Sequence, residues 1–337
     1  MVSNLPLAGE DLTTQCNFHL ALCRLAIARC NKLGDIMSFL VDQVIKLENI
    51  RDAYLDLVDK FDLASQSAKY EGLDAVKLVQ VDYQSLDVIN EVKEALTANL
   101  NLIPIRLAKI PKRRGGFRNV YILSVRDRIR ARAIYRILEP LCEKAYSRFL
   151  FSYRSNHSSF FAGKSLAKRY RRSYEQDFVL TMDLKSYSDY IDHDILKEKL
   201  FAIGVDDEFY QLLIPFIKVK LCQNGEMVDN KIGIPQGTPL TALFANLYLN
   251  DADKEVGPLV DFYRRVGDDL IVCDKNEAKV KIVYERLKNI ANDLKLKVSD
   301  KKTHILQPNQ TFDFLGYTFA NGKISLDASF VKNLLFS

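Results

Sequence analysis

Two apolar stretches of this chain each end in aspartate, and this pattern constrains the fold more than any other feature. Asp183 follows the run 178–182, and the run 261–266 leads through a glycine into Asp268 and Asp269. Short apolar runs of this kind predict buried strands with carboxylates at their tips. Hard divalent cations are usually held by one or two carboxylates plus substrate phosphates. The alternative is that these residues only form turns, since Asp and Gly-Asp favour loops and hairpins.

A Gly/Pro loop lies between the two aspartate sites. It spans 233–240 and is followed by a run with apolar residues at helical spacing, 241–249. Gly233 and Gly237 allow the backbone to approach another group closely. Gln236 offers a side-chain amide to a sugar or base. This order of segments indicates a nucleotide pocket beside the carboxylates.

Five segments in one order, between about Ile105 and Tyr317, resemble the palm motifs of the reverse transcriptase superfamily. The match is closest to the bacterial branch of group II intron and defence-associated enzymes. The segments are 183–193, 233–249, 266–269, 296–303 and 314–317. The resemblance implies an α+β fold with right-hand polymerase fingers and palm, and RNA-directed DNA synthesis with a role in antiviral defence. It also implies two Mg²⁺ ions, or Mn²⁺ in their place, with nucleoside triphosphates and an RNA template or DNA product as partners.

The same resemblance assigns roles to single residues. Asp183 and Asp268 are expected to ligate the metal ions, with Asp269 beside them and the backbone carbonyl of Leu184 as a further ligand. Lys302 is expected to protonate the leaving pyrophosphate, and a solvated turn lysine is an equal alternative. The segment expected to grip the primer comprises Phe314, Leu315, Gly316 and Tyr317.

A basic glycine turn precedes these motifs. It separates a strand ending near Pro111 from a strand over 117–123, which predicts a hairpin. By resemblance this hairpin is the fingers element over the incoming nucleotide, with Lys112 on the phosphates and Arg118 over the base and triphosphate. Charge-assisted contacts to phosphate suit both residue types.

Positive charge is concentrated in part of the chain. The first hundred residues hold 9 Lys and Arg against 15 Asp and Glu, whereas 104–136 holds 11 Lys and Arg and a single acid. Such clustering is the electrostatic footprint of a nucleic-acid partner. For the arginines of 126–136, the alternative is the solvated face of a helix. More basic residues follow at Lys164, Lys168, Arg169, Arg171 and Arg172.

The organisation of the chain follows from these segments. Helical periodicity over about 10–33, 35–61 and 86–100 predicts a helical N-terminal extension without a chemical motif. We expect this extension at 1–100, fingers at 101–177, a palm at 178–319, and a tail or the start of a thumb at 320–337. Because a helical thumb needs several helices, we expect a truncated chain, or a homo-oligomer or partner subunit that supplies the thumb.

The same sequence bears on location. No apolar run approaches the roughly 20 residues that span a membrane, and the start does not resemble a signal peptide. We therefore expect a cytoplasmic protein without a membrane partner.

Two positions depart from the family pattern. Ser188 stands where the family has a bulky aromatic that collides with a ribose 2′-hydroxyl, and Val266 replaces the aromatic before the double aspartate. These residues keep open a template-independent or ribonucleotide-incorporating polymerase of the same fold. A non-catalytic nucleic-acid-binding or structural subunit of an oligomer is the alternative of another class. The presence of Asp183, Asp268 and Asp269 argues against that alternative.

Overall fold

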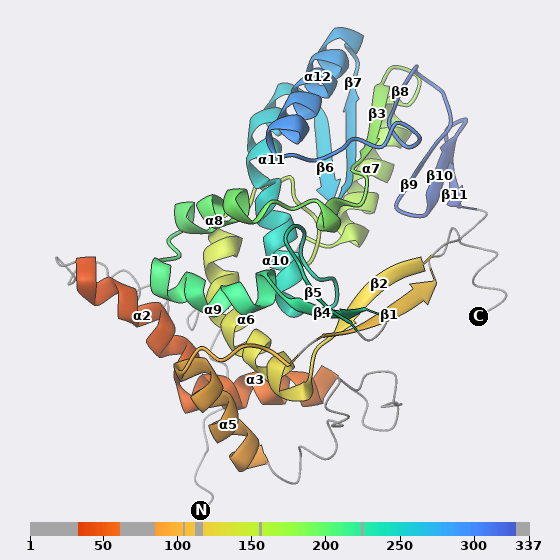
Figure 1. The fold of residues 1–337 in the computed structure, drawn as a ribbon. Helices are drawn as coiled ribbons and strands as arrows, with labels where there is room; N and C mark the ends of the chain where they lie inside the picture. The colour runs from red at the N-terminus through yellow and green to blue at the C-terminus, as the bar shows by residue number, and fades with distance from the viewer. Residues whose placement is uncertain are drawn as a thin grey trace, which may run out of the picture.

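The computed structural model describes residues 33–60, 85–103, 105–111, 117–154, 157–223 and 226–327. Within these ranges, two four-stranded sheets and one three-stranded sheet are flanked by helices (Figure 1). This mixture of helices and sheets confirms the predicted α+β class. No helix in the described ranges has the length and apolar character needed to cross a membrane.

The N-terminal helices in the described part of the chain are α2 (Leu33–Ile45), α3 (Leu47–Lys60) and α5 (Ser85–Thr97). The sequence pattern predicted one continuous helix where α2 and α3 stand, and the structure shows a break at Lys46. The side-chain amide of Asn49 stabilises the break, because it donates hydrogen bonds to the carbonyl oxygens of Val44 and Ala133 at 3.1 Å each. The helix expected over 10–33 lies outside the described residues.

Two hairpins from distant parts of the chain form the first sheet, which has the order β2-β1-β4-β5. Its strands are β1 (Ile105–Pro111), β2 (Phe117–Ile122), β4 (Lys220–Gln223) and β5 (Glu226–Asp229). β1 and β2 are antiparallel with Arg118 opposite Ile110, which confirms the hairpin predicted from the sequence. The turn 112–116 lies outside the described residues.

Seven further helices within the described ranges connect and cover the sheets. They are α6 (Val125–Ala145), α7 (Ser159–Ser173), α8 (His193–Ala202), α9 (Asp207–Ile217), α10 (Pro239–Tyr248), α11 (Asn250–Val256) and α12 (Glu277–Asp293). Polar side chains cap several of them by accepting a free backbone N–H in the first turn. Ser124 does so for α6, Asp192 for α8 and Thr238 for α10.

The palm sheet, with the order β6-β7-β3-β8, carries the aspartates. Its strands are β3 (Phe178–Asp183), β6 (Phe262–Val266), β7 (Asp269–Asp274) and β8 (His304–Leu306). Side chains alternate between its two faces. Leu180 and Val272 join the main core with α12, whereas Val179 and Ile271 join a smaller core with α7. Because β3 and β7 are antiparallel, the end of β3 and the start of β7 meet at one edge.

A small sheet follows, with the order β11-β10-β9. Its strands are β9 (Phe312–Phe314), β10 (Tyr317–Ala320) and β11 (Lys323–Leu326). Phe312 and Phe319 stack at 4.8 Å between ring centroids, and the ring of Tyr170 on α7 meets Phe319 edge-on at 5.2 Å. β11 is a strand where the sequence suggested the first thumb element from Ile324 onward. Residues 328–337 lie outside the described part of the chain.

Candidate active site

The predicted carboxylates gather at the edge where β3 ends and β7 begins. The strand register places Asp183 directly opposite Asp269. Directly opposed residues of an antiparallel pair have Cβ atoms roughly 4.5–5.5 Å apart. Asp268 precedes Asp269 in the turn of the β6–β7 hairpin, which Gly267 enters with a φ of 65°. The structure therefore brings the predicted metal-binding aspartates to one corner of the palm sheet, called the carboxylate corner below.

Burial and like charge shape the electrostatics of this corner. Asp183 is only 6% exposed. Burial raises the pKa of Asp269 to about 7, with further contributions from the charges of Asp268 and Asp183 and from a hydrogen bond with Asp183. Burial and nearby like charges disfavour the ionised carboxylate, and the charge of Lys302 opposes them only in part. The corner thus holds more negative charge than the surrounding protein stabilises.

Lys302 is the one cation of the described residues that bonds directly to Asp183, with Nζ 2.7 Å from Oδ2. Burial lowers the pKa of Lys302, but the hydrogen bond and charge of Asp183 outweigh burial and hold this pKa above its ordinary value. The side chain is nevertheless 57% exposed. Lys302 is therefore a charged ammonium that binds Asp183 and remains largely exposed to solvent.

The corner offers oxygen donors that suit a hard cation. Within the described residues, no group of three or more His, Cys, Asp or Glu side chains is arranged as a complete metal site. Mg²⁺ does not need one, because it keeps several waters and takes substrate phosphates as ligands. The isolated bridge between Leu184 and Val298 uses the carbonyl of Asp183, which accepts from Ser299 N–H at 2.9 Å. The carbonyl of Leu184 is not the acceptor in that hydrogen bond.

The Gly/Pro loop docks between two protein backbones. The carbonyl of Gln236 accepts a hydrogen bond from Tyr121 N–H on β2 at 2.7 Å. Gly237 has a φ of 113°, and a Cβ there would lie 2.7 Å from the carbonyl oxygen of Tyr121. A Cβ on Gly233 would lie 2.7 Å from the carbonyl oxygen of Asp189. The close approach predicted for both glycines is confirmed, and the neighbouring group is the protein's own backbone.

Ser188 lies against this loop, because its carbonyl accepts a hydrogen bond from Ile234 N–H at 2.8 Å. The neighbouring aromatic points away into the core: the Tyr187 hydroxyl donates to the carbonyl of Ala245 on α10 at 2.6 Å, and Tyr187 is 5% exposed. Position 188 therefore carries a small polar side chain beside the loop, and Tyr187 is held in the core.

The remaining predicted nucleotide contacts are placed in part. Lys112 lies outside the described residues. The backbone of Arg118 belongs to β2, and its side chain is not part of the described structure. Since Tyr121 docks the same strand on Gln236, β2 adjoins the predicted pocket.

The predicted primer grip is the tight β9–β10 turn. Leu315 and Gly316 both have positive φ, 51° and 83°, as in the two-residue turns that suit the twist of a hairpin. Phe314 is buried and Tyr317 is 40% exposed, so the hairpin presents one aromatic outward. These residues belong to the small sheet and not to the sheet of the aspartates.

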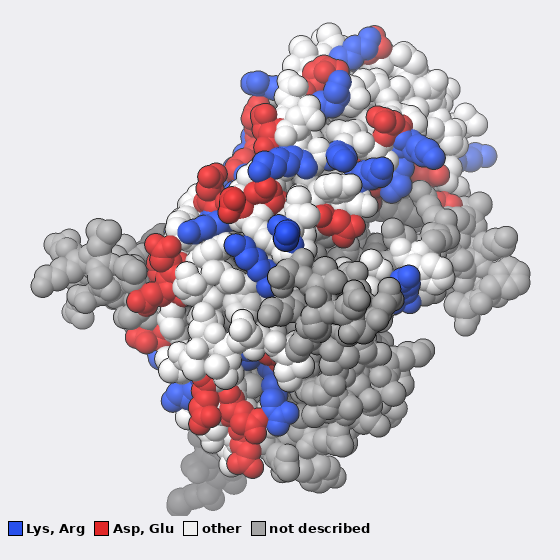
Figure 2. Space-filling model, viewed as in Figure 1, with Lys and Arg blue, Asp and Glu red and all other residues white. Residues whose placement is uncertain are grey.

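The arginines of α6 turn inward to carboxylates of the protein. Arg132 Nε donates to Asp56 Oδ2 at 2.7 Å, and Arg136 Nη2 donates to Asp52 Oδ2 at 2.9 Å. Both acids belong to α3, so the acidic N-terminal helices neutralise α6. On the face drawn in Figure 2, acidic and basic side chains are interspersed rather than gathered into one basic patch. These arginines therefore do not form the expected footprint for nucleic acid.

Helix α7 differs, because four of its basic side chains are exposed and form no ion pair within the described part of the chain: Lys164, Lys168, Arg171 and Arg172. Phe160 and Phe161, 65% and 45% exposed, lie at the start of the same helix. Arg169 is the exception, since it binds Asp177 at 2.6 Å. We call the four basic residues with the two phenylalanines the α7 basic face.

Comparison with known proteins decides the family. A family model described as reverse transcriptase (RNA-dependent DNA polymerase) matches residues 110–319. The chain belongs to the reverse transcriptase family. This family consists of nucleotidyltransferases and generally uses divalent metal ions. The matched range contains the carboxylate corner, the Gln236 loop, α7 and the β9–β10 turn.

Relatives of this reverse transcriptase include bacterial and fungal proteins. Protein YkfC of Escherichia coli (strain K12) is 24% identical over 295 residues, which cover 76% of this chain and 77% of YkfC. The group II intron-encoded protein LtrA of Lactococcus lactis subsp. cremoris is 27% identical over 198 residues, covering 58% of this chain and 33% of LtrA. A putative COX1/OXI3 intron 1 protein of Saccharomyces cerevisiae is 23% identical, over 56% of this chain and 22% of that protein.

Solved structures confirm the fold. Telomerase from Candida albicans, with a TWJ fragment of telomeric RNA, matches with a TM-score of 0.52 at 15% identity, over 75% of this chain and 50% of that one. Apo telomerase from Candida tropicalis gives the same TM-score and identity, over 75% and 54%. The chain thus spans about half of these telomerases and a third or less of the intron proteins above.

The sequence pattern of this reverse transcriptase did not single out its most buried ion pair. Arg265 and Asp253 are both 0% exposed, and Arg265 Nη2 lies 2.7 Å from Asp253 Oδ2. The signal was present: an arginine stands within an apolar run, on the same side of β6 as the buried Tyr263. A charged residue at a core-facing strand position indicates a buried partner.

Proposed function

We propose that this chain catalyses RNA-directed DNA synthesis, with divalent ions held at the carboxylate corner. The observation that carries the proposal is the opposition of Asp183 and Asp269 across β3 and β7, in a site where burial and Asp268 raise the pKa of Asp269 to about 7. A corner of this kind gains stability from an added cation. Ion pairs that only stabilise the fold lie elsewhere in the protein, as those of the α6 arginines show.

When bound, two divalent ions supply a clamp on the attacking and leaving oxygens of an in-line displacement. Asp183 and Asp268 hold the ions in this proposal, with Asp269 beside them and the Leu184 carbonyl as a further ligand. The primer 3′-hydroxyl loses its proton to solvent and attacks the α-phosphate of the nucleotide, while the bond from that phosphorus to the pyrophosphate oxygen breaks. Lys302 is the charged donor next to Asp183, and it releases a proton to the departing pyrophosphate.

We place the nucleotide pocket beside β2 and the Gln236 loop, which contact each other directly. We place the triphosphate against Lys112 and Arg118, and the sugar beside Ser188 and the Gln236 amide. Fixed donors of this kind stabilise charge that develops during phosphoryl transfer. The loop that carries Gln236 is held by hydrogen bonds to Tyr121 and Ser188, which supports a preformed pocket floor.

Nucleic acid is proposed to follow the α7 basic face and the β9–β10 turn. Exposed basic side chains bind phosphates, and exposed aromatics stack on bases of single strands. Phe160 and Phe161 add such rings to the four exposed cations of α7. An RNA template, a primer and nucleoside triphosphates are the partners in this proposal. A cytoplasmic location belongs to it as the expectation from the sequence, and a role in antiviral defence belongs to it on the sequence resemblance alone.

A second candidate function rests on Ser188. An aromatic is absent at this position, and Tyr187 is tied to Ala245 in the core, so the usual collision with a ribose 2′-hydroxyl is lost. This favours a ribonucleotide-incorporating polymerase of the same fold, and template-independent synthesis is compatible with it.

Primer extension separates these functions. The purified chain is given a labelled primer, with an RNA template, a DNA template or none, and with deoxy- or ribonucleotides, in Mg²⁺ or EDTA. We expect templated deoxynucleotide addition on RNA in Mg²⁺ only. Addition without a template, or of ribonucleotides alone, would favour the second candidate. Absence of any synthesis under all conditions would overturn both.

A further inference from the structure

Both peptide groups of Gly267 are held by buried side chains. Its N–H donates to Ser152 Oγ at 3.0 Å, and its carbonyl accepts from Arg265 Nη1 at 3.0 Å. Gly267 is the residue immediately before Asp268 and Asp269. With a φ of 65°, it is also the residue on which the turn direction depends. Two independent hydrogen bonds therefore fix the peptide planes from which the double aspartate projects.

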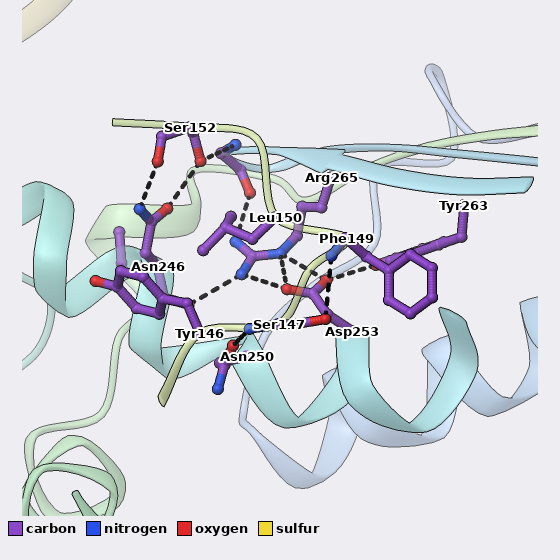
Figure 3. Close-up of polar contacts among 12 residues, drawn as sticks. Tyr146, Ser147, Phe149, Leu150, Ser152, Asn246, Asn250, Asp253, Tyr263 and Arg265 are labelled. Carbon is purple, nitrogen blue, oxygen red and sulfur yellow. Dashed lines mark hydrogen bonds and ion pairs between the residues drawn. The ribbon is translucent and has the colours of Figure 1, made fainter. Parts of the chain in front are cut away.

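Arg265 is itself fixed by a fork of hydrogen bonds (Figure 3). Its Nε donates to Asp253 Oδ1 at 2.8 Å, and its Nη2 donates to Asp253 Oδ2 at 2.7 Å. Nη2 also donates to the carbonyl oxygen of Asn246 at 2.9 Å. The planar guanidinium presents its donors in one rigid geometry. With the other donors engaged, Nη1 can point only towards the carbonyl of Gly267.

Ser152 is fixed in a matching way by α10 (Figure 3). Its hydroxyl donates to Asn246 Oδ1 at 2.8 Å, and the Asn246 amide donates to the carbonyl of Ser152 at 2.8 Å. The Ser152 oxygen is then oriented to accept the Gly267 N–H. Asn246 lies on α10, the helix that begins directly after the Gln236 loop. One buried hydrogen-bond network thus joins the turn at the carboxylate corner to α10.

We propose that Arg265 and Ser152 are positioning residues that set the double-aspartate turn for metal binding through the two peptide groups of Gly267. The inference rests on the proposed function of the carboxylate corner and deepens it. Second-layer partners of metal ligands typically contribute tenfold to a hundredfold in metal affinity or activity. We expect the same range here, although the two residues act on backbone groups beside the ligands.

The buried charge itself supports this role. A buried ion pair is a weak source of stability, because well-packed apolar residues of similar volume often replace it without loss. Filling the space between β6 and α11 therefore does not require Arg265 and Asp253. Donation to the Gly267 carbonyl does require the guanidinium. The guanidinium also donates to the Asn246 carbonyl, and Asp253 accepts from the buried Tyr263 hydroxyl, so the pair joins the turn to α10 and β6.

The test uses three variants of the full chain. Ser152→Ala removes the acceptor of the Gly267 N–H with a small change in volume. The double variant Arg265→Met with Asp253→Leu removes the donor to the Gly267 carbonyl while leaving no buried charge unpaired. The control, Arg130→Met with Asp127→Leu, replaces the other buried Arg–Asp pair, which is 3% and 4% exposed and lies at the start of α6.

Two quantities are measured for each variant: the dissociation constant of Mn²⁺, from the electron paramagnetic resonance signal of the free ion, and the rate of single-nucleotide incorporation. Asp268→Asn defines Mn²⁺ bound elsewhere. We expect Ser152→Ala and the Arg265 double variant to weaken Mn²⁺ binding about tenfold or more and to lower the maximal rate, with the nucleotide KM little changed. The control pair should keep the wild-type Mn²⁺ affinity.

Unchanged Mn²⁺ affinity in both site variants would overturn the inference, and so would an equal loss in the folded control. If the Arg265 double variant does not fold, Ser152→Ala decides alone. If the wild-type chain binds Mn²⁺ through Asp268 yet incorporates no nucleotide, the proposed function fails, whereas the positioning role is still judged by the Mn²⁺ affinities.

Discussion

The arginines of α6 and the aspartates of the carboxylate corner are both clusters of like charge. The fold pairs the arginines with carboxylates, whereas it leaves the aspartates with excess negative charge. Each arginine that points from α6 towards α3 meets a carboxylate there, as Arg132 meets Asp56 at 2.7 Å. At the corner, Asp183 meets Lys302, while Asp269 faces two further carboxylates with its pKa raised to about 7, chiefly by burial. Charges that a fold neutralises itself are structural. Like charges that the fold brings together without enough opposite charge favour the binding of a ligand of opposite charge.

The same contrast holds between two groups of basic residues, the α6 arginines and the α7 basic face. Its lysines and arginines lie in the same chain as the acidic α3, yet they form no ion pair within the described residues, whereas the less exposed Arg169 beside them binds Asp177. By the same reasoning, α6 supports the fold, whereas the α7 basic face is the proposed contact with nucleic acid. The predictions below test this division.

The largest effect is expected at the corner. Asp183→Ala should lower nucleotide incorporation by roughly a thousandfold, because a misplaced cation no longer stabilises the transition state. Circular dichroism and the melting temperature should show a folded variant. Asp207→Ala is the matched control, since Asp207 is an acid that is 67% exposed at the start of α9. Wild-type rates in the Asp183 variant would remove the corner from catalysis.

Excess charge at the corner should also make stability depend on pH. The folded state raises the pKa of Asp269 from 3.8 to about 7, so the folded protein holds a proton that the unfolded chain releases. The contribution of Asp269 to stability is therefore highest at low pH and falls as the pH rises to about 7. Without divalent ions, the free energy of unfolding should fall by about 2 kcal/mol between pH 5.5 and 7.

Chemical denaturation in EDTA measures this pH dependence. Asp269→Asn should reduce the fall in the free energy of unfolding between pH 5.5 and 7. Mg²⁺ should stabilise the wild-type chain more at pH 8 than at pH 5.5. A profile that Asp269→Asn leaves unaltered would show that the charge of this residue is already balanced by the protein.

Variants of the two basic helices, α6 and α7, should differ in how their affinity for nucleic acid depends on salt. Replacing Lys164, Lys168, Arg171 and Arg172 with Ala should weaken binding of a primed template about tenfold. The slope of log affinity against log salt should flatten by nearly one for each phosphate that the variant no longer binds. Arg136→Met should instead lower the melting temperature and leave the slope unaltered, because its partners are Asp52 and Asp56. The reverse pattern would contradict the division between α6 and α7.

The smallest effect is expected at Ser188. Ser188→Phe restores a steric barrier, and rejection by collision depends on that side chain. The ratio of deoxy- to ribonucleotide incorporation should rise several-fold, within the roughly 1–3 kcal/mol that small steric differences provide. Tyr190 is the residue able to act as the barrier instead, since Tyr187 is hydrogen-bonded in the core. Strong deoxynucleotide selectivity in the wild-type chain, unaltered by Ser188→Phe, would assign the barrier to another residue.

The carboxylate corner was predictable from the sequence because its parts are local. An apolar run followed by Asp183, and a glycine before Asp268, identify strand ends without knowledge of their neighbours. The close backbone approach at Gly233 and Gly237 was predictable for the same reason, since the absence of a side chain is a property of the residue itself.

Long-range partners were not predictable in this way. Arg132 and Arg136 bind acids 76 and 84 residues earlier in the chain, so their charges looked free in the sequence. The break between α2 and α3 depends on Asn49 reaching Ala133, again 84 residues away. The positioning network likewise joins three separate segments through Ser152, Asn246 and Arg265. Local periodicity carries no information on such contacts.

The most direct test of the central claim is the rate of single-nucleotide incorporation on a primed RNA template as a function of Mg²⁺ concentration. We expect no incorporation in EDTA and a saturable rise with Mg²⁺, which Asp268→Asn abolishes without unfolding the chain. Incorporation that persists in EDTA, or that Asp268→Asn leaves at the wild-type rate, would contradict the claim that the excess charge of the corner serves a divalent cation.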